Sequence, residues 1–193
     1  MIPDTVHVAL QVIEVLEDLG ISYHVGGSFA SSIHGVPRQT RDLDLAVELN
    51  VGHVRGLVSR LEKEFYVDSE MIRSAISRRG SFNIVHLDSG FKVDMFCRKN
   101  EFFDRSEFRR RLRKRLIQDL AREVMVSTAE DTVLRKLQWY KIGGQVSEQQ
   151  WYDVLGVLKT QDERLDRDYL EYWAGKLDLA DLLERALAET SSP

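Results

Sequence analysis

The sequence is poor in several features that mark particular classes of protein. Among 193 residues it has one cysteine, Cys97, so it cannot form an internal disulfide, and it lacks the clustered Cys and His residues of a structural zinc site. No apolar run approaches the roughly 20 residues of a membrane-spanning helix. No basic stretch followed by an apolar core marks a secretory signal. We therefore expect a cytoplasmic protein with no membrane association.

The charge balance argues against a protein that is basic overall. The formal net charge is −4, which does not favour general binding to nucleic acid. The charge is uneven, however, because residues 105–115 read RSEFRRRLRKR and hold seven basic residues against one acidic residue. This segment is the best candidate for a contact with an RNA or DNA backbone, although a solvated strand or helix edge also explains it and is the interpretation we favour.

Hydrophobic periodicity predicts an α/β (α+β) region over residues 1–126, followed by a C-terminal helical region, 127–193, packed on it. Strands are expected at 21–25, 42–47, 81–87 and 91–96, the last two forming a hairpin around 88–90, with a further pair at 109–117 and 123–127. Helices are expected at 4–19, 28–34, 52–63, 69–79, 129–142, 148–159, 166–175 and 178–189.

Three aspartates form the main candidate site. Asp42 and Asp44 lie two apart on a predicted strand, and because side chains alternate between faces, both carboxylates point to the same side. Asp94 lies between Val93 and Met95 in another predicted strand, an apolar setting in which a carboxylate needs a partner. If the two strands are neighbours, the three carboxylates converge and could hold divalent cations that assist a phosphoryl displacement. Asp-x-Asp alone usually indicates a solvated strand face or a turn, but its combination with Asp94 and with an upstream Gly-Gly-Ser favours a site.

A glycine-rich turn precedes the acidic pair. VGGSFA at 25–30 places Gly26 and Gly27 between a predicted strand and a predicted helix. Glycine permits close backbone approach, and free N–H groups at the start of a helix bind anions. Ser28 adds a hydroxyl donor. A plain β–α turn explains Gly-Gly-Ser alone equally well, so the phosphate-binding interpretation depends on the Asp-x-Asp that follows 14 residues after Ser28.

The combined pattern resembles the nucleotidyltransferase superfamily that includes DNA polymerase β. The resemblance rests on VGGSFASSIHGVPRQTRDLDLAV and the later FKVDMF, within residues 25–96. It implies a mixed sheet flanked by helices, ligation of Mg²⁺ (or Mn²⁺) by Asp42, Asp44 and Asp94, and contacts from Gly27 and Ser28 to the triphosphate of an NTP.

Within that superfamily, GVPRQTRDLDL is similar to a bacterial branch, the abortive-infection type (AbiEii-like) toxin nucleotidyltransferases and their uncharacterised relatives. In that branch a helix begins near Glu-Asp and carries Lys-Leu, which STAEDTVLRKL matches. The resemblance implies a phosphate contact for Lys136. These relatives often have Asp-x-x-Asp on the next helix, whereas this sequence has Gln150 at the first position and Asp153 at the second.

Other polar and aromatic residues permit two interpretations each. Arg38 and Arg41 could bind phosphates through charge-assisted hydrogen bonds, and Arg41 could equally balance Asp42. His24 and His34 have no partner at ligand spacing, so packing or surface roles are expected. The aromatics of the helical region are expected in the core between helices rather than as base-stacking platforms; they are Trp139, Tyr140, Trp151, Tyr152, Tyr169, Tyr172 and Trp173.

The sequence thus predicts a metal-dependent nucleotidyltransferase that binds an NTP such as ATP. It would transfer a nucleoside monophosphate to a hydroxyl of an unidentified acceptor, which could be a protein, a tRNA or a small molecule. The toxin branch implies a possible cognate antitoxin. Two alternatives stay open: a catalytically silent nucleotide-binding partner protein, and a nucleic-acid binder that uses residues 105–115.

Overall fold

A seven-stranded mixed sheet organises the part of the chain that the structure describes. The computed structural model describes residues 4–117 and 121–191, so the outer ends of the two predicted regions lie outside it. The strands follow the order β3 (Phe65–Tyr66), β4 (Ser81–His86), β5 (Lys92–Cys97), β2 (Asp42–Val47), β1 (Tyr23–Val25), β7 (Glu123–Val126) and β6 (Leu112–Arg115). β2 pairs with β5 and β1 with β7 in parallel, and the other pairs are antiparallel.

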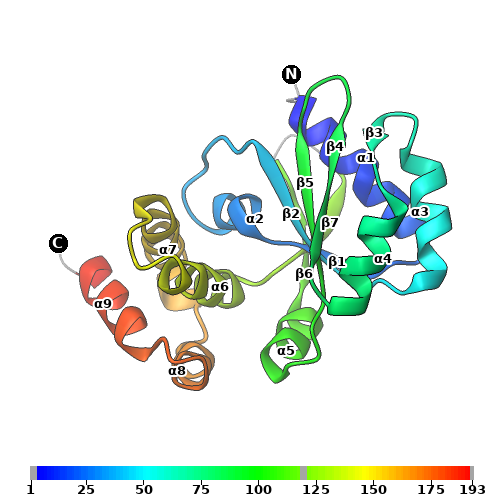
Figure 1. Ribbon diagram of the computed structural model, residues 1–193. Helices are drawn as coiled ribbons and strands as arrows, with labels where there is room; N and C mark the ends of the chain where they lie inside the picture. Colours follow the sequence, from blue (N-terminus) through cyan, green and yellow to red (C-terminus); the bar gives the residue numbers. More distant parts are fainter. Residues whose placement is uncertain (1–3, 118–120, 192–193) are drawn as a thin grey trace.

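Helices flank the sheet on both sides (Figure 1). They are α1 (Asp4–Asp18), α2 (Gly27–His34), α3 (Val54–Leu61), α4 (Ser69–Arg78), α5 (Phe102–Arg110), α6 (Ala129–Ile142), α7 (Glu148–Gln161), α8 (Arg167–Lys176) and α9 (Ala180–Ser191), with short 3₁₀ turns η1 (Val51–His53) and η2 (Asp162–Arg164). The expected fold class, a mixed sheet flanked by helices and followed by a helical region, is confirmed. No helix in residues 4–117 and 121–191 combines the length and apolar character needed to cross a bilayer.

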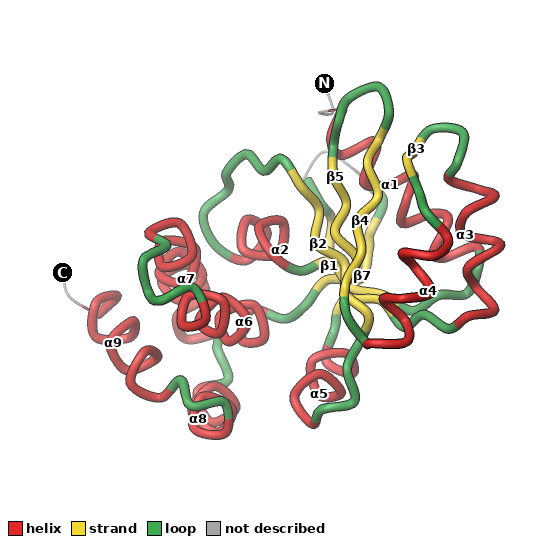
Figure 2. Tube along the Cα trace, viewed as in Figure 1, coloured by secondary structure: helices red, strands yellow, loops and turns green. Residues whose placement is uncertain are grey.

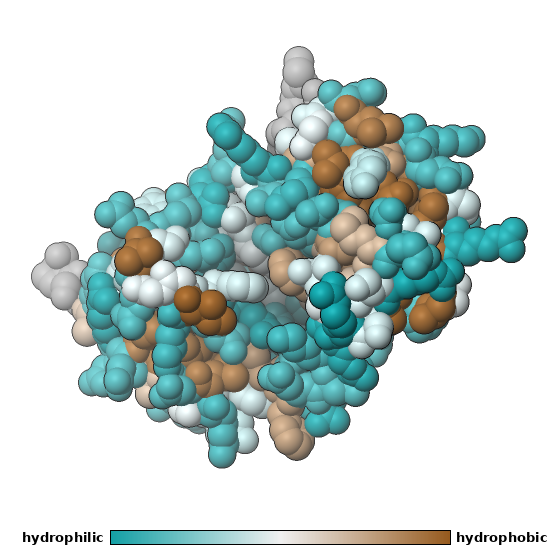
Figure 3. Space-filling model, in the orientation of Figure 1, coloured by the Kyte–Doolittle hydropathy of each residue, from teal (hydrophilic) through white to brown (hydrophobic). Residues whose placement is uncertain are grey.

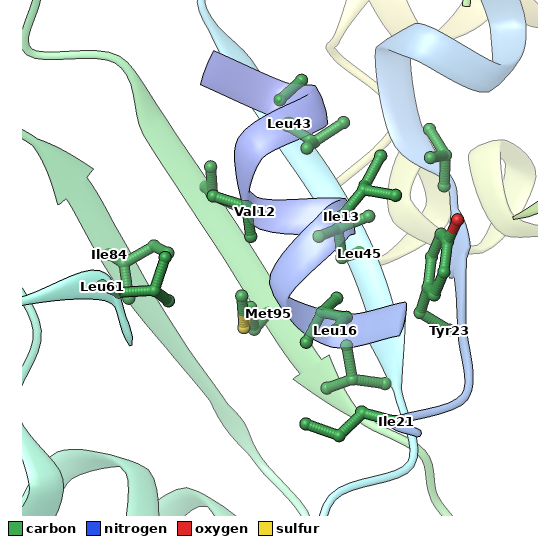
Figure 4. Close-up of a cluster of buried hydrophobic side chains, with 14 of the residues drawn as sticks. Val12, Ile13, Leu16, Ile21, Tyr23, Leu43, Leu45, Leu61, Ile84 and Met95 are labelled. Carbon is green, nitrogen blue, oxygen red and sulfur yellow. The ribbon is translucent and has the colours of Figure 1, made fainter. Parts of the chain in front are cut away.

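One face of the sheet is sealed by α1, α3 and α4 (Figures 1 and 2). The alternating pattern of β2 buries Leu43 and Leu45 completely against this layer. Figure 4 shows Ile13 and Leu16 of α1 directed onto them, with Met95 of β5 beside them. Each such side chain contributes roughly 1.5–3 kcal/mol when it leaves water, so burial fixes which face of β2 points inward. The residues between them must then point to the other face.

The second face of the sheet looks toward α2, α6 and α7 (Figure 1). The buried apolar residues of α6 to α9 form a cluster of their own, which also takes in Phe103 of α5. The predicted division at 126/127 stays a prediction. β7 ends at Val126 and α6 begins at Ala129, so only Ser127 and Thr128 join the sheet to the helical region.

This junction is held by hydrogen bonds on both sides. The Ser127 N–H donates to the Val25 carbonyl of β1 (3.0 Å), and the His34 ring contacts the Ser127 carbonyl (2.8 Å). The carbonyl of His34 in turn accepts from Gln161 of α7 (2.5 Å). A Cβ on Gly35 would lie 2.7 Å from the backbone N of Val157, so α2 ends directly against the backbone of α7. α2 therefore joins the sheet to the helical region.

The arginine-rich segment differs from the prediction. A strand was expected from residue 109, but α5 runs to Arg110 and β6 begins only at Leu112. The buried face of α5 is formed by Phe103, Glu107 and Phe108, and Glu107 is charged, so the helical apolar pattern is interrupted at its centre. The expected pairing of this segment with 123–127 is otherwise confirmed, because β6 and β7 are antiparallel neighbours.

The expectation that the aromatics of the helical region are core residues is only partly correct. Tyr140 and Trp151 are buried, whereas Trp139, Tyr152 and Tyr172 are more than half exposed. The exposed residues each adjoin another aromatic in the sequence. Neighbours in a helix point about 100° apart because a turn holds 3.6 residues, so both members of such a pair cannot face one core.

Candidate active site

The three candidate aspartates lie on adjacent strands. β2 and β5 pair in parallel with Asp44 opposite Asp94 and Asp42 opposite Lys92. Neighbouring strands are about 4.8 Å apart, so the carboxylates of Asp44 and Asp94 leave the same face of the sheet as close neighbours. Asp42 lies two residues before Asp44, at the N-terminal end of β2. The structure therefore brings the three predicted residues together on the face that α1, α3 and α4 leave uncovered.

The glycine turn packs directly against Asp44. The Gly26 N–H donates to the Asp44 carbonyl (2.9 Å), which holds the turn to β2. Gly27 has a left-handed backbone with φ +53°, and a Cβ there would lie only 1.8 Å from Asp44 Oδ2. Only glycine has room at this position, and its φ favours glycine as well. The N-terminus of α2 consequently faces the acidic pair, with Ser28 in its first turn.

The charges at this site are incompletely balanced. Burial, and then the negative charges of Asp42 and Asp94, raise the pKa of Asp44 to about 6. The positive charge of Lys136 and a hydrogen bond from the Ser28 backbone act in the opposite direction without cancelling the rise. A carboxylate whose like-charged neighbours raise its pKa gains from a nearby cation.

Two neighbours hold the outer carboxylates. Lys92 Nζ contacts Asp94 Oδ2 (2.7 Å), and the Thr40 hydroxyl donates to Asp42 (3.0 Å). Among the described residues, the side chains of His, Cys, Asp and Glu as they stand do not form a group of three that could hold a metal ion. The donor set nevertheless fits a hard divalent cation, which prefers carboxylate oxygens and keeps several waters and phosphate oxygens.

Two basic side chains, those of Arg38 and Lys136, contact Asp153 of α7. Arg38 binds the Asp153 carboxylate with two hydrogen bonds (both 2.9 Å), and Lys136 Nζ donates to the same carboxylate (2.8 Å). Arg38 also donates to the Ser28 hydroxyl (2.5 Å). Burial acts to raise the pKa of Asp153, but these cations outweigh it and lower the pKa. Arg38 and Lys136 are thus held beside the glycine turn. Arg41 is exposed and has no hydrogen bond or ion pair within the described residues.

Comparison with known proteins identifies the fold. Neither a protein-family model nor the sequence of a curated protein matches the chain. Among solved structures, it is similar to the lincosamide antibiotic adenylyltransferase LnuA in its lincomycin-bound form, with 12% identity, a TM-score of 0.52, and 81% of this chain and 96% of that chain covered. It is also similar to an antigenic nucleotidyltransferase-like protein from Paracoccidioides brasiliensis, with 14% identity, a TM-score of 0.54, and coverage of 96% and 93%. The chain has a nucleotidyltransferase fold.

Within this nucleotidyltransferase fold, two residues beside the aspartates were not predicted from the sequence. Strand alternation could have indicated Lys92, because it lies two residues before Asp94 and its side chain therefore points to the same face. Thr40 gives no such signal, since it lies in the loop before β2. Asp153 was noticed only through the resemblance, and its ion pairs connect loop residue Arg38 with helix residue Lys136, a tertiary contact that no spacing predicts.

Within the nucleotidyltransferase fold, His24 and His34 are packed in buried positions, as expected. His24 is buried, with Nε2 3.4 Å from Glu107 and its ring 5.3 Å from that of Phe108. His34 is buried at the end of α2, where burial lowers its pKa despite the hydrogen bond to the Ser127 carbonyl. Both are held by groups outside the aspartate cluster.

Proposed function

We propose that the chain is a metal-dependent nucleotidyltransferase that moves a nucleoside monophosphate from an NTP to an acceptor hydroxyl. The observation that carries the proposal is the close contact between the left-handed Gly27 and the Asp44 carboxylate, opposite Asp94 on the next strand. A phosphate-binding helix start and a carboxylate cluster then face the same space. This is the pairing that transfer from a nucleoside triphosphate needs.

Each residue has a role in this proposal. Asp42, Asp44 and Asp94 would hold Mg²⁺ (or Mn²⁺), which when bound supplies positive charge that neutralises the triphosphate and the pyrophosphate leaving group. Gly27 offers its backbone N–H and Ser28 its hydroxyl to the phosphates, while Gly26, whose N–H donates to the Asp44 carbonyl, holds the turn in place.

Three basic residues complete the phosphate contacts. Arg38 and Lys136 lie close enough to the Ser28 turn to contact phosphate oxygens, provided that they exchange contacts with Asp153. Arg41 is exposed and adjoins Asp42, so it is free to bind the outermost phosphate.

The transfer step balances without further reagents. The acceptor oxygen forms a bond to the α-phosphorus, and the bond between that phosphorus and the oxygen bridging to the β-phosphate breaks, so that pyrophosphate leaves with the bonding electrons. The hydroxyl proton passes to Asp94. Lys92 contacts Oδ2 of this carboxylate, so Lys92 must release Oδ2 to the metal when Oδ1 accepts the proton.

Incubation with α-labelled NTPs and Mg²⁺ tests the proposal. Label should pass to a protein, RNA or small-molecule fraction in the presence of the wild-type chain and not with Asp42→Asn or Asp44→Asn. Binding of an NTP without release of pyrophosphate would instead indicate a catalytically silent nucleotide-binding partner protein. The absence of both label transfer and NTP binding would refute the enzyme assignment.

The toxin role is a narrower proposal that rests on the STAEDTVLRKL segment. This segment forms the junction and start of α6, and its Lys136 is buried beside the candidate site. If the chain is a toxin, its induced expression should stop growth, Asp44→Asn should relieve the arrest, and a neighbouring gene product should act as the antitoxin. Normal growth under induction would refute the toxin role without affecting nucleotidyl transfer.

A further inference from the structure

A pocket lined by arginines opens beside α5, away from the aspartates. It has a volume of about 540 Å³. Its basic lining consists of Arg98, which follows β5, together with Arg105, Arg109 and Arg111 of α5 and its C-terminal end. The surface around α5 is mostly hydrophilic in Figure 3. The only acidic residue in the lining is Glu48.

The positive charge of this arginine pocket is largely uncompensated. Glu48 is paired with Arg98 (2.5 Å), and within the described residues Arg105, Arg109 and Arg111 have no carboxylate partner. The Nε atoms of Arg98 and Arg111 are buried without a hydrogen-bond acceptor. These two atoms are shielded from a ligand, but an anion with several oxygens would gain from the outer N–H groups of the unpaired arginines.

Aromatic rings hold the guanidinium groups in place. Arg98 and Arg111 stack on the ring of Phe108 at 5.5 and 4.5 Å from its centroid, and Arg105 lies 4.8 Å from the centroid of Phe102. Phe102 is itself 77% exposed at the pocket. An exposed ring among arginines is the combination that binds single-stranded nucleic acid, because phosphates contact the cations and a base stacks on the ring.

The pocket lies in line with the candidate active site. The pairing of β2 with β5 places Asp44 beside Asp94 and Ala46 beside Phe96, and the next pair on the same face is Glu48 and Arg98. Arg98 directly follows β5 and lies four positions after Asp94, which corresponds to about 13 Å along an extended chain. A ligand that occupies both places must therefore be longer than one phosphate group.

An aromatic pair lies between the aspartates and the arginine pocket. Phe96 of β5 lies halfway from Asp94 to Arg98, and its ring centroid is 6.4 Å from that of Trp139 on α6. Trp139 is more than half exposed. The face between the aspartates and the arginines thus offers flat apolar groups and no further carboxylate from β2 or β5.

We propose that the arginine pocket binds the backbone phosphates of a single-stranded nucleic acid acceptor, whose terminal hydroxyl reaches Asp94. The assignment of the acceptor rests on the proposed nucleotidyl transfer, but the binding itself does not. An acidic protein segment is disfavoured, because carboxylates would use the charge of the pocket and leave the exposed ring of Phe102 without a stacking partner.

Fluorescence anisotropy with a 5′-labelled 12-nucleotide RNA, in EDTA and without NTP, tests the binding. The three arginines without a carboxylate partner predict a slope of log K against log salt of about −2, so binding weakens about eighteenfold between 50 and 200 mM salt. The pair Arg105→Ala and Arg109→Ala, both exposed, should reduce the slope to about −0.7. Phe102→Ala should weaken binding about tenfold or more.

Controls separate this proposal from the enzyme proposal. Arg55→Ala, an exposed arginine of α3 beyond the sealed face of the sheet, should leave RNA binding unchanged. Asp44→Asn should lose binding of Mg²⁺-NTP and keep binding of RNA, whereas the double arginine variant should show the reverse. Equal affinity for poly-L-glutamate of matched length, unchanged RNA binding by the double arginine variant, or no RNA binding at 50 mM salt would each overturn the proposal.

Discussion

Substitution of Gly27 by alanine provides the sharpest test of how the glycine turn and Asp44 depend on each other. The added Cβ would lie 1.8 Å from Asp44 Oδ2, whereas real Cβ contacts essentially never fall below 3.0 Å. The carboxylate or the turn must therefore move by about 1.2 Å or more. Displacements of this size lower rates by about 100-fold where reacting groups must be aligned. A left-handed alanine costs roughly 1–2 kcal/mol in addition.

Gly27→Ala should therefore weaken binding of Mg²⁺-NTP at least about tenfold and lower the free energy of unfolding by about 1–2 kcal/mol. Calorimetric titration with each of the four NTPs and urea unfolding measure the two effects. Gly26→Ala is the matched control, because Gly26 has φ −122° and a Cβ added there would have no atom within 4 Å. Equal nucleotide affinity in the two variants would refute the coupling between the turn and the carboxylate.

Three further predictions concern stability and metal dependence. Burial acts to raise the pKa of Glu107, but Arg135 and His24 outweigh burial and lower the pKa from 4.5 to about 2. The ionised carboxylate therefore stabilises the fold above about pH 4.5. This contribution to stability is lost as the pH falls toward 2. Glu107→Gln should lower the free energy of unfolding at pH 7 by about 3 kcal/mol and flatten its acid dependence in urea titrations. Asp153→Asn leaves the buried ammonium of Lys136 without its carboxylate and should destabilise the protein by about 3 kcal/mol, with partial recovery in a double variant with Lys136→Met. EDTA should abolish NTP binding, and added Mg²⁺ should restore it.

Each of these predictions has an outcome that contradicts it. An unchanged acid limb for Glu107→Gln would mean that Arg135 is balanced by Asp104 alone, which also accepts from it (2.5 Å). Additive effects of the two substitutions in the second case would mean that the pair is not coupled. NTP binding that persists in EDTA would show that the nucleotide does not depend on a metal ion held by the three carboxylates.

Much of the sheet was predictable because burial alternates along its strands. The pattern DLDLAV is sufficient to place Asp42 and Asp44 on one face and Leu43 and Leu45 on the other. Register is different, because it depends on partners far apart in the sequence. That Asp94 lies opposite Asp44, rather than one position away on the opposite face, follows from the packing of the complete sheet.

The elements that were missed depend on charged groups that become buried. α5 is stabilised by Glu107, which accepts hydrogen bonds from Arg135 of α6 (2.6 and 2.8 Å). In the sequence both residues resemble solvated helix positions. Arg38 and Asp153 pair across 115 positions for the same reason. Ion pairs of this kind carry no periodic signal, so they emerge only when helices and loops have been placed.

The two-residue link between β7 and α6 has a consequence for how molecules reach the aspartates. Ser127 is hydrogen-bonded to β1 and to α2, and α2 ends against the backbone of α7. The helical region is therefore anchored to the sheet at more than one point, which opposes a hinge movement. We therefore expect the helical region to keep its position on the sheet when ligands bind. The rate at which charged ligands bind should then depend on ionic strength, and binding should show no slow conformational step.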